Sequence, residues 1–349
     1  MARFGAFCYP GTGHINPMTG LAHSLQLRGH QVVLFGIPDT EARVRAAGVG
    51  FHPIGVEDFP PGTLQKLDEH MARLTGLAAL RFTLDRISNT ARMVRRDGPD
   101  AVRAEKIDVL LVDQAEFAGS VADRVDIPWI SIALVPPMVP DDRFPPFWFD
   151  WPAGQDRLSR LRNRIGMTVL TWIASPILKE ANQKRIDWGL QPFKRPEDGL
   201  SPLAQIAQLP EALEFEVGGK SMESLHYTGP FVHQQQRPPV DFPWDRLDGR
   251  PLIYASLGTL QNGSEAIFRT IAEACAGLDA QLVISLGAGL DPARLGKLAG
   301  DPLVVRFAPQ LEILKRTALV ITHAGINTVL ESLSEGVPMV AIPLGNDQP

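Results

Sequence analysis

Two histidines, His14 and His323, each follow a short apolar run that predicts a β-strand. Each lies in a glycine-bearing turn that leads into a predicted helix. An imidazole can accept a proton near neutral pH. A helix N-terminus offers backbone N–H groups and a positive dipole end to an anion. The two turns therefore predict one site for proton transfer and one site for a phosphate-bearing ligand.

The first turn places His14 just ahead of a predicted helix. Asn16 suits the N-cap of that helix and Pro17 its first position. Gly11 and Gly13 let the backbone turn tightly and leave room for a substrate above it. A nearby positive helix end disfavours the imidazolium form, so we expect His14 to be neutral near pH 7.

The expected partner of His14 is Asp113, which follows the predicted strand Ile107–Val112. Ligands of open α/β sheets bind beyond the carboxyl ends of strands, so both residues are expected to face one crevice. A carboxylate bonded to one imidazole nitrogen would leave the other as a general base. The structural alternative is that His14 satisfies local backbone groups and Asp113 caps the next helix.

The second turn follows the predicted strand Leu319–Thr322. His323 and the N–H groups of residues 324–328 would meet phosphates there. A further turn runs from Ser256 to Thr259 after another predicted strand, and it could present N–H groups to the same kind of anion.

Glu331 has two possible roles. The run from Thr328 to Glu331 matches a capping box, in which the carboxylate reaches back to the Thr328 N–H. Alternatively, the carboxylate could bind two ribose hydroxyls. Asp347 and Gln348, near the end of the sequence, could simply be surface loop residues.

Composition restricts the class of protein. The chain has 349 residues, which suits two domains rather than one. A formal net charge of −5 without a long basic run argues against a nucleic-acid partner. Cys8 and Cys275 are too few for a disulfide framework, and no signal peptide is recognised, so we expect a cytoplasmic protein. The longest apolar stretch, Gly166–Leu178, is too short to span a bilayer.

Strands alternate with helices in both halves of the chain, which predicts an α/β fold with parallel, doubly wound sheets. A Gln- and Pro-rich stretch at 231–250 is interpreted as a linker between a first domain, 1–230, and a second domain, 251–349. The second domain has roughly 100 residues, so we expect it to be incomplete. Predicted strands are 4–9, 31–35, 107–112, 129–134, 252–256, 281–286, 303–307, 319–322 and 339–343, and predicted helices are 17–28, 64–96, 118–125, 264–276, 311–315 and 328–335.

Together these motifs resemble family 1, nucleotide-sugar-dependent glycosyltransferases. The stretch from Phe307 through His323 to Glu331, with the later Asp347-Gln348 pair, is similar to the family's donor-binding box. Gly13-His14 and Val112-Asp113 are similar to its acceptor-side motifs. Within the family, residues 112–116 and 201–209 resemble bacterial zeaxanthin glucosyltransferases.

The resemblance implies a GT-B fold, in which an acceptor-binding and a donor-binding Rossmann-like domain face each other across a cleft. It implies that His14 is the general base and that Asp113 orients it. Phe307 would stack on uracil, Gln310 and Glu331 would bind the ribose, and Asp347 and Gln348 would choose the sugar. The residues that would surround the diphosphate are Ser256, His323, Gly325, Asn327 and Thr328, with Thr259 beside them.

The implied reaction is an inverting transfer of a sugar, expected to be glucose, from a UDP-sugar to a hydroxyl. The UDP-sugar is a co-substrate, and neither a cofactor nor a metal is expected. The aromatic run 145–151 and the arginines after it could wall a pocket for a hydrophobic acceptor such as a carotenoid. The run could instead contact a membrane surface peripherally, or simply pack on the first domain. Oligomeric state is not predicted.

Two alternatives remain open. Gly11-Thr-Gly13 after a strand, with Asp39 further on, could indicate a nicotinamide-dependent oxidoreductase, although Asn16 stands where a third glycine is needed. The chain could also be an inactive fragment or a protein that binds nucleotide sugars without transferring them.

Overall fold

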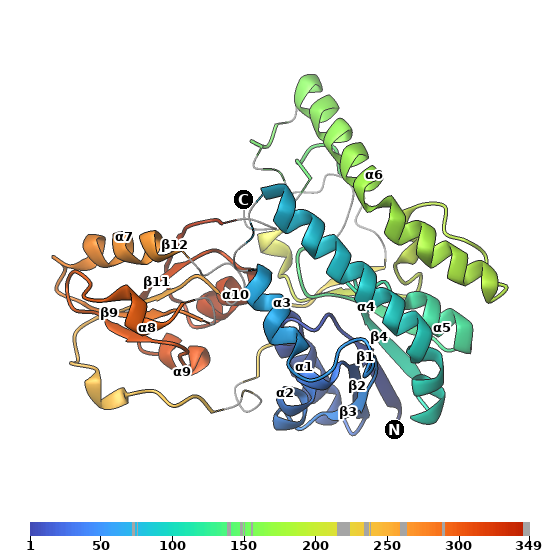
Figure 1. Ribbon diagram of the computed structural model, residues 1–349, viewed down its shortest axis with the longest axis horizontal. Coiled ribbons are helices and arrows are strands. Elements are labelled where there is room, and N and C mark those ends of the chain that lie inside the picture. The colour runs from blue at the N-terminus through green and yellow to red at the C-terminus, as the bar shows by residue number, and fades with distance from the viewer. Residues whose placement is uncertain are drawn as a thin grey trace. The chain divides into compact units, whose positions relative to one another are not determined.

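The computed structural model describes residues 1–71, 74, 76–137, 141–146, 149, 151–154, 156–214, 224–233, 237, 239–258, 264–287 and 290–344. The chain divides into two compact units, which are coloured along the sequence in Figure 1. The first unit contains Met1–Leu64 and Leu80–Arg237. The second contains Gln65–Ala79 and Pro238–Pro349.

The first unit is built on a seven-stranded sheet in the order β3-β2-β1-β4-β5-β6-β7, and every neighbouring pair is parallel. The inner strands are buried on both faces, as parallel sheets covered by helices must be. The strands are β1 Arg3–Phe7, β2 Gln31–Gly36, β3 Gly50–Pro53, β4 Val109–Asp113, β5 Trp129–Ala133, β6 Gln205–Ala207 and β7 Leu225–Tyr227.

Helix α1 packs against this sheet through Ile15, Met18 and Ala22, which join strand residues in one core cluster. Gly20 allows the backbone at Phe231 to cross the helix, because a Cβ at Gly20 would lie 2.2 Å from the Phe231 carbonyl oxygen. The helices of the first unit are α1 Thr12–Gln26, α2 Glu41–Ala46, α4 Gly76–Ala104 from Leu80 onward, α5 Gly119–Val125 and α6 Arg157–Asp187, with short 3₁₀ turns at Pro38–Thr40, Pro196–Gly199 and Glu211–Leu213. Helix α3, Thr63–Met71, belongs from Gln65 onward to the second unit.

The second unit has a five-stranded parallel sheet in the order β10-β9-β8-β11-β12. Apolar side chains on both faces of β8, β9 and β11 form its two core clusters. Its elements are a 3₁₀ turn at Trp244–Arg246, β8 Leu252–Ser256, α7 Glu265–Cys275, β9 Gln281–Ser285, α8 Pro292–Leu295, β10 Leu303–Val305, α9 Gln310–Leu314, β11 Thr317–Thr322, α10 Ile326–Ser334 and β12 Met339–Ala341.

The predicted alternation of strands and helices around parallel sheets is confirmed. The helix predicted over 64–96 is wrong in one respect, because it is two helices, α3 and α4. Gly76 begins α4 with a φ of 55°, a left-handed conformation that a continuous helix does not contain. Helix α4 then continues past Arg96 to Ala104, with Pro99 inside it.

The boundary between the two units, at Arg237, falls within the stretch interpreted as a linker. The interpretation of 231–250 as one linker is too broad, since both of its ends pack on cores. Phe231 contacts the core of the first unit, and Phe242 is buried in the core of the second. Residues 234–236 and 238 lie outside the described residues. None of the helices in the described ranges is long and apolar enough to cross a membrane.

Candidate functional site

The end of β4 and the turn after β1 lie side by side because the two strands pair in parallel, with Phe7 opposite Val112. Asp113 therefore emerges beside the turn that carries His14. The Asp113 Oδ2 atom lies 2.7 Å from the His14 Nδ1 atom. The Asp113 side chain is fully buried, whereas the His14 side chain is 17% exposed. The structure thus brings these two predicted residues into direct contact.

Backbone groups hold the Asp113 carboxylate in this position. The Tyr9 N–H donates to Oδ2 at 3.2 Å, and the Ala115 N–H donates to Oδ1 at 3.1 Å. An ionised carboxylate only accepts hydrogen bonds, so the proton of this pair is on His14 Nδ1. Nε2 is then the basic nitrogen of the ring. The alternative that Asp113 caps the next helix is wrong, because the N-cap of α5 is Ala118.

Helix α1 begins earlier than predicted. Its N-cap is Gly11, and the N–H groups of His14 and Ile15 both donate to the Gly11 carbonyl oxygen, at 3.0 and 2.9 Å. The prediction that Asn16 is the N-cap and Pro17 the first helical residue is therefore wrong. Pro17 lies inside the helix, where it lacks one N–H without ending the helical backbone. His14 belongs to the first turn of α1 rather than to the loop before it.

Glu116 is a buried acid beside this pair whose burial the sequence did not indicate. It is 2% exposed, and its carboxyl group lies near the Thr90 hydroxyl and the Arg95 guanidinium. Burial raises the pKa of Glu116 to about 8, and the negative charge of Asp113 adds to this effect. The Thr90 hydroxyl and the Arg95 guanidinium act in the opposite direction. Near pH 7 the Glu116 carboxyl is therefore protonated. The available signals were its three-residue separation from Asp113 and its place in the 112–116 motif.

Two neighbouring groups respond to the same buried environment. Burial raises the pKa of the Cys8 thiol well above its usual value, and the carboxyl groups of Asp113 and Glu116 raise it further. The thiol therefore stays protonated. Burial also lowers the pKa of Arg95, which is 2% exposed and donates from Nη2 to Glu180 at 3.3 Å. Solvent exclusion therefore dominates the protonation of the groups around Asp113.

The second candidate site lies in the second unit, where β8 and β11 pair with Ser256 opposite Thr322. The turns after these strands are consequently neighbours. The His323 ring fills the space between the two turns. A Cβ at Gly258 would lie 2.5 Å from the ring Cε1 atom, and a Cβ at Gly325 would lie 2.4 Å from Nε2. Gly258 also has a φ of +77°, which favours glycine.

The packing of His323 limits its chemistry. Burial lowers the pKa of His323 to about 4, although a hydrogen bond with the Ser256 backbone opposes the change. The ring is therefore neutral near pH 7. It offers no positive charge to an anion, and the single N–H of the neutral ring is used in the hydrogen bond with the Ser256 backbone.

Helix α10 begins directly after this histidine. Ala324 has a left-handed φ of 66°, and the N-cap is Gly325. The first N–H groups of a helix have no acceptor within the helix itself, so the first turn of α10, which includes Asn327, suits an anion. The predicted helix start at Thr328 is wrong, because this turn of the backbone starts the helix at Ile326.

Glu331 does not form the predicted capping box, since Thr328 is already inside α10. The Glu331 carboxylate is 2% exposed and accepts a hydrogen bond from the Gln310 Nε2 atom at 2.6 Å. The same Nε2 atom lies 3.3 Å from the Thr328 hydroxyl, and the Tyr254 hydroxyl lies 3.4 Å from Gln310 Oε1. The structure therefore joins three predicted residues, Gln310, Thr328 and Glu331, in one polar cluster.

Of the remaining predicted residues, Phe307 and Ser256 lie at or just after the ends of strands in the second unit. Phe307 follows β10 and is 44% exposed, and the Arg306 guanidinium lies over its ring at 5.8 Å from the ring centre. The Ser256 side chain is 7% exposed at the end of β8. Thr259, Asp347 and Gln348 lie outside the described residues. Within the described ranges, no group of three His, Cys, Asp or Glu side chains could hold a metal ion.

Comparison with known families matches both parts of the chain. Residues 159–349 match the model of the UDP-glucoronosyl and UDP-glucosyl transferase family. Residues 10–94 match the N-terminal domain of glycosyltransferase family 28.

Individual relatives agree with these matches. Zeaxanthin glucosyltransferase of Pantoea ananas is 30% identical over 353 residues, covering 100% of this chain and 81% of that protein. Demethyllactenocin mycarosyltransferase of Streptomyces fradiae is 29% identical, covering 98% and 71%. Among solved structures, the glycotransferase of kitacinnamycin superposes with a TM-score of 0.73 at 22% identity, covering 100% of this chain and 82% of that one. The glycosyltransferase VinC in complex with DTDP superposes with a TM-score of 0.64 at 20% identity, covering 98% and 81%.

Two parallel-sheet α/β units that match these structures define a GT-B glycosyltransferase fold. The chain belongs to the UDP-glucoronosyl and UDP-glucosyl transferase family, that is, to the family 1 glycosyltransferases. The predicted family and fold are thereby confirmed. The alternative of a nicotinamide-dependent oxidoreductase receives no support from these relatives.

The glycine beside His323 gives a stability prediction. We expect Gly325→Ala to lower the free energy of unfolding by about 1–3 kcal/mol, because the new methyl group overpacks against a ring that Gly258 already confines. Gly277→Ala is the control, since a Cβ there meets nothing within 4 Å. Urea unfolding of both variants measures the difference. Equal stability of the two would mean that the His323 ring moves aside freely.

The buried carboxyl of Glu116 gives a pH prediction. The pKa of Glu116 is about 8 in the folded chain, above the value of 4.5 in the unfolded chain. Between these two pH values the folded chain therefore keeps a proton on Glu116 that the unfolded chain has released. Stability is therefore lost as pH rises through this window, by an amount on the order of 4 kcal/mol. We expect Glu116→Gln to remove this loss and to become more stable than the wild type toward pH 8.

Urea unfolding from pH 5 to pH 8 tests the Glu116 prediction. Glu57→Gln, at an exposed position of the same unit, is the matched control. A Glu116→Gln variant that loses stability relative to the wild type as pH rises would show that Glu116 is ionised and paired, with Arg95 as its nearest cation.

Proposed function

We propose that the chain is an inverting, metal-independent glycosyltransferase that moves glucose from UDP-glucose to a hydroxyl group of a hydrophobic acceptor. The observation that carries this proposal is the 2.7 Å contact between His14 Nδ1 and the fully buried Asp113 carboxylate. An imidazole held in this way has one nitrogen fixed by a carboxylate and one nitrogen available to accept a proton. No cofactor takes part, and the UDP-sugar is a co-substrate.

The proposed step is a single displacement at the anomeric carbon. The acceptor oxygen forms a bond to this carbon while His14 Nε2 takes its proton, and the bond from the carbon to the UDP oxygen breaks. UDP leaves with the electron pair of the broken bond. Attack from the opposite face inverts the configuration. The Asp113 charge stabilises the imidazolium ion that forms, because it lies 2.7 Å from the ring.

The donor would bind in the second unit. The first turn of α10 would hold the diphosphate, with Ser256, Gly325, Asn327 and Thr328 around it, because the helix start presents N–H groups and a positive dipole end. The neutral His323 ring would lie beside the diphosphate and hold the two turns apart, without supplying a charge.

The polar cluster of Gln310 and Glu331 would bind the ribose hydroxyls, and the exposed Phe307 side chain would stack on the base. Stacking does not distinguish uracil from thymine, and one structural relative is described with DTDP. Preference for UDP is therefore part of the proposal. Thr259 would assist at the diphosphate, and Asp347 and Gln348 would bind the sugar.

The proposed acceptor is a large hydrophobic alcohol. Two similar curated proteins are zeaxanthin glucosyltransferases, from Pantoea ananas and Pseudescherichia vulneris, which supports a carotenoid. The aromatic run 145–151 is less informative about this pocket than expected. The Trp151 ring packs on α6, since a Cβ at Gly166 would lie 2.7 Å from it. Phe147, Trp148 and Asp150 lie outside the described residues.

Substitution of the proposed base tests the function. We expect His14→Ala to reduce transfer from UDP-glucose to a hydrophobic alcohol by about 10²–10⁴-fold, because the acceptor loses its general base. Affinity for UDP should remain unchanged, since the donor residues belong to the other unit. Product chromatography and calorimetry with UDP measure the two effects.

His226→Ala, at an exposed histidine of the same unit, is the control for His14→Ala. Equal loss of transfer and UDP binding would make His14 structural. A wild-type chain that binds UDP but transfers no sugar to any acceptor would support the alternative of a nucleotide-sugar binder without catalytic activity.

The ribose site gives a separate prediction. We expect Glu331→Gln to weaken UDP binding by about 10-fold or more, because a charged acceptor of hydrogen bonds is lost. We expect the wild type to prefer UDP over 2′-deoxy-UDP in calorimetry, and the variant should lose this preference. Glu335→Gln, at an exposed position one turn further along, is the control. Retained affinity and retained preference in Glu331→Gln would place the ribose elsewhere.

A further inference from the structure

The outward face of α6 carries a stripe of exposed apolar side chains. These are Leu158 at 78% exposed, Leu161 at 54%, Ile165 at 57%, Val169 at 43% and Trp172 at 75%. Single exposed apolar residues are common on protein surfaces, but a contiguous group of large ones marks an interaction site. These five residues are called the apolar stripe below.

Helix geometry places the whole apolar stripe on one side of α6. The residues are spaced by three or four positions, and at 3.6 residues per turn they fall within an arc of about 80°. The opposite side of the helix is buried through Asn163, Gly166, Ile177 and Ala181. The apolar stripe is therefore a second apolar face, distinct from the face that packs on the first unit.

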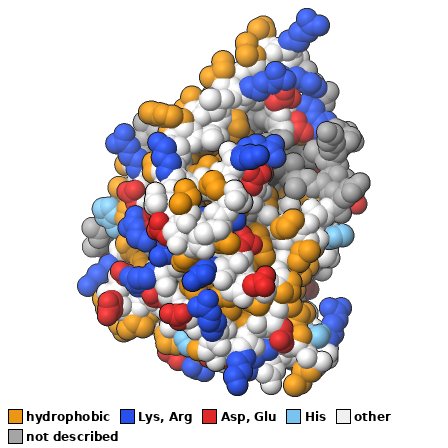
Figure 2. Space-filling model, turned by 90° about the vertical axis from the view of Figure 1, so that its right-hand side faces the viewer, with side chains coloured by type: hydrophobic (Ala, Val, Ile, Leu, Met, Phe, Trp, Pro, Cys, Tyr) orange, Lys and Arg blue, Asp and Glu red, His pale blue; other side chains and the backbone are white. Residues whose placement is uncertain are grey.

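The chemistry around the apolar stripe is basic. Between Arg157 and Trp172 the helix has four arginines and no acidic residue. Helix geometry places Arg157 and Arg164 on one flank of the stripe and Arg162 on the other. The half-buried Arg162 guanidinium packs over the Trp151 ring at 5.1 Å and donates to the Pro152 carbonyl oxygen at 2.7 Å. Arg164 is 68% exposed and bonds to Asp142 at 2.6 Å, which offsets part of its charge. Figure 1 draws the first turns of α6 at the top of the view. At the top of Figure 2, which is the same view turned about the vertical axis, hydrophobic side chains lie beside Lys and Arg side chains.

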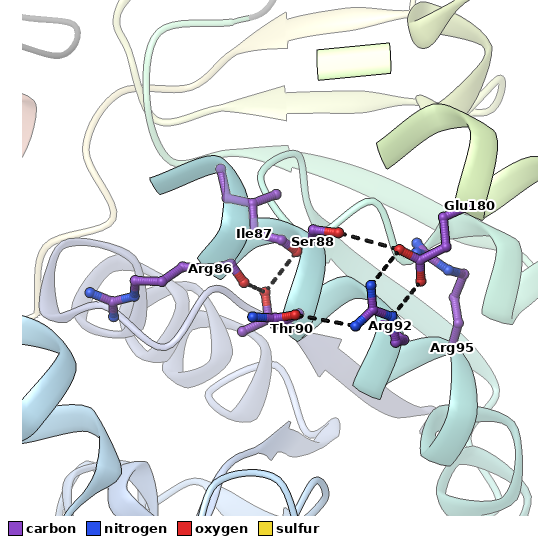
Figure 3. Close-up of polar contacts among 8 residues, drawn as sticks. Arg86, Ile87, Ser88, Thr90, Arg92, Arg95 and Glu180 are labelled. Carbon is purple, nitrogen blue, oxygen red and sulfur yellow. Dashed lines mark hydrogen bonds and ion pairs between the residues drawn. The ribbon is translucent and has the colours of Figure 1, made fainter. Parts of the chain in front are cut away.

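The inner face of α6 is already fastened to α4. Glu180 of α6 accepts hydrogen bonds from Arg92 Nε at 3.1 Å, from Arg95 Nη2 at 3.3 Å and from the Ser88 hydroxyl at 3.3 Å (Figure 3). Nearer its start, the Asn163 side chain donates to the Asp142 carbonyl oxygen at 2.9 Å. Because these contacts fix the buried side, the apolar stripe is held outward.

We propose that this face of α6 docks on an anionic lipid membrane surface. An interfacial helix combines an apolar face that enters the acyl boundary with cationic side chains that meet lipid phosphates. Leucine, isoleucine and valine supply the apolar face here, tryptophan suits the interfacial depth, and arginine supplies the charge on both flanks. Charge complementarity therefore favours a surface of anionic lipid. The inference goes beyond the proposed transfer reaction and is independent of it.

Co-sedimentation with vesicles tests the proposal on the 349-residue chain. The wild type should bind vesicles of phosphatidylcholine with phosphatidylglycerol at least about 10-fold more tightly than vesicles of phosphatidylcholine alone, and added salt should weaken the binding. Leu161→Glu with Ile165→Glu should lower binding by about 10-fold or more. The matched control is Leu27→Glu with Leu203→Glu, two leucines that are 70% and 61% exposed elsewhere in the same unit, and it should bind like the wild type.

Trp172 provides a second readout that needs no disruptive change. The tryptophan emission of the wild type should shift to shorter wavelength on vesicles, and Trp172→Phe should remove most of the shift while it retains binding. Absence of binding to both kinds of vesicle would overturn the proposal, as would binding that the double glutamate variant leaves unchanged. A dimer in sedimentation velocity that this variant dissociates, without any lipid binding, would instead assign the stripe to a second copy.

Discussion

The buried carboxylate of Asp113 is the group on which the first candidate site depends. A charge that is fully removed from water must be hydrogen-bonded, and two backbone N–H groups and the His14 ring meet this requirement. The same contact fixes which imidazole nitrogen carries the proton. One electrostatic requirement of folding therefore also prepares the histidine to accept a proton.

Protonation near this carboxylate follows from solvent exclusion. Glu116 lies in the same turn as Asp113, yet burial and the neighbouring charge raise its pKa to about 8. Two carboxyl groups in one buried turn thus differ, since Glu116 is neutral near pH 7, whereas Asp113 is bonded to two backbone N–H groups and to the His14 ring.

Both units use parallel strand pairing to bring turns together. In the first unit, β1 beside β4 places His14 against Asp113. In the second, β8 beside β11 places the His323 ring between Gly258 and Gly325. The two histidines nevertheless differ in environment, because His14 contacts a carboxylate and remains partly exposed, whereas the His323 ring is neutral and fills the space between two turns. Sheet topology thus supplies the proximity, and the immediate neighbours decide the chemistry.

The sequence by itself determined the α/β class, the family and the identity of most candidate residues, since local periodicity and short motifs reflect strand and helix preferences. Only the tertiary structure decided the start of α10, the hydrogen bond of Glu331 to Gln310, the burial of Glu116 and the exposed face of α6. The capping signals at Asn16 and Thr328 predicted the wrong first residues for α1 and α10, because several residues near a helix start satisfy the same local rule. Burial and long-range partners depend on which strands pair, and no local pattern contains that information.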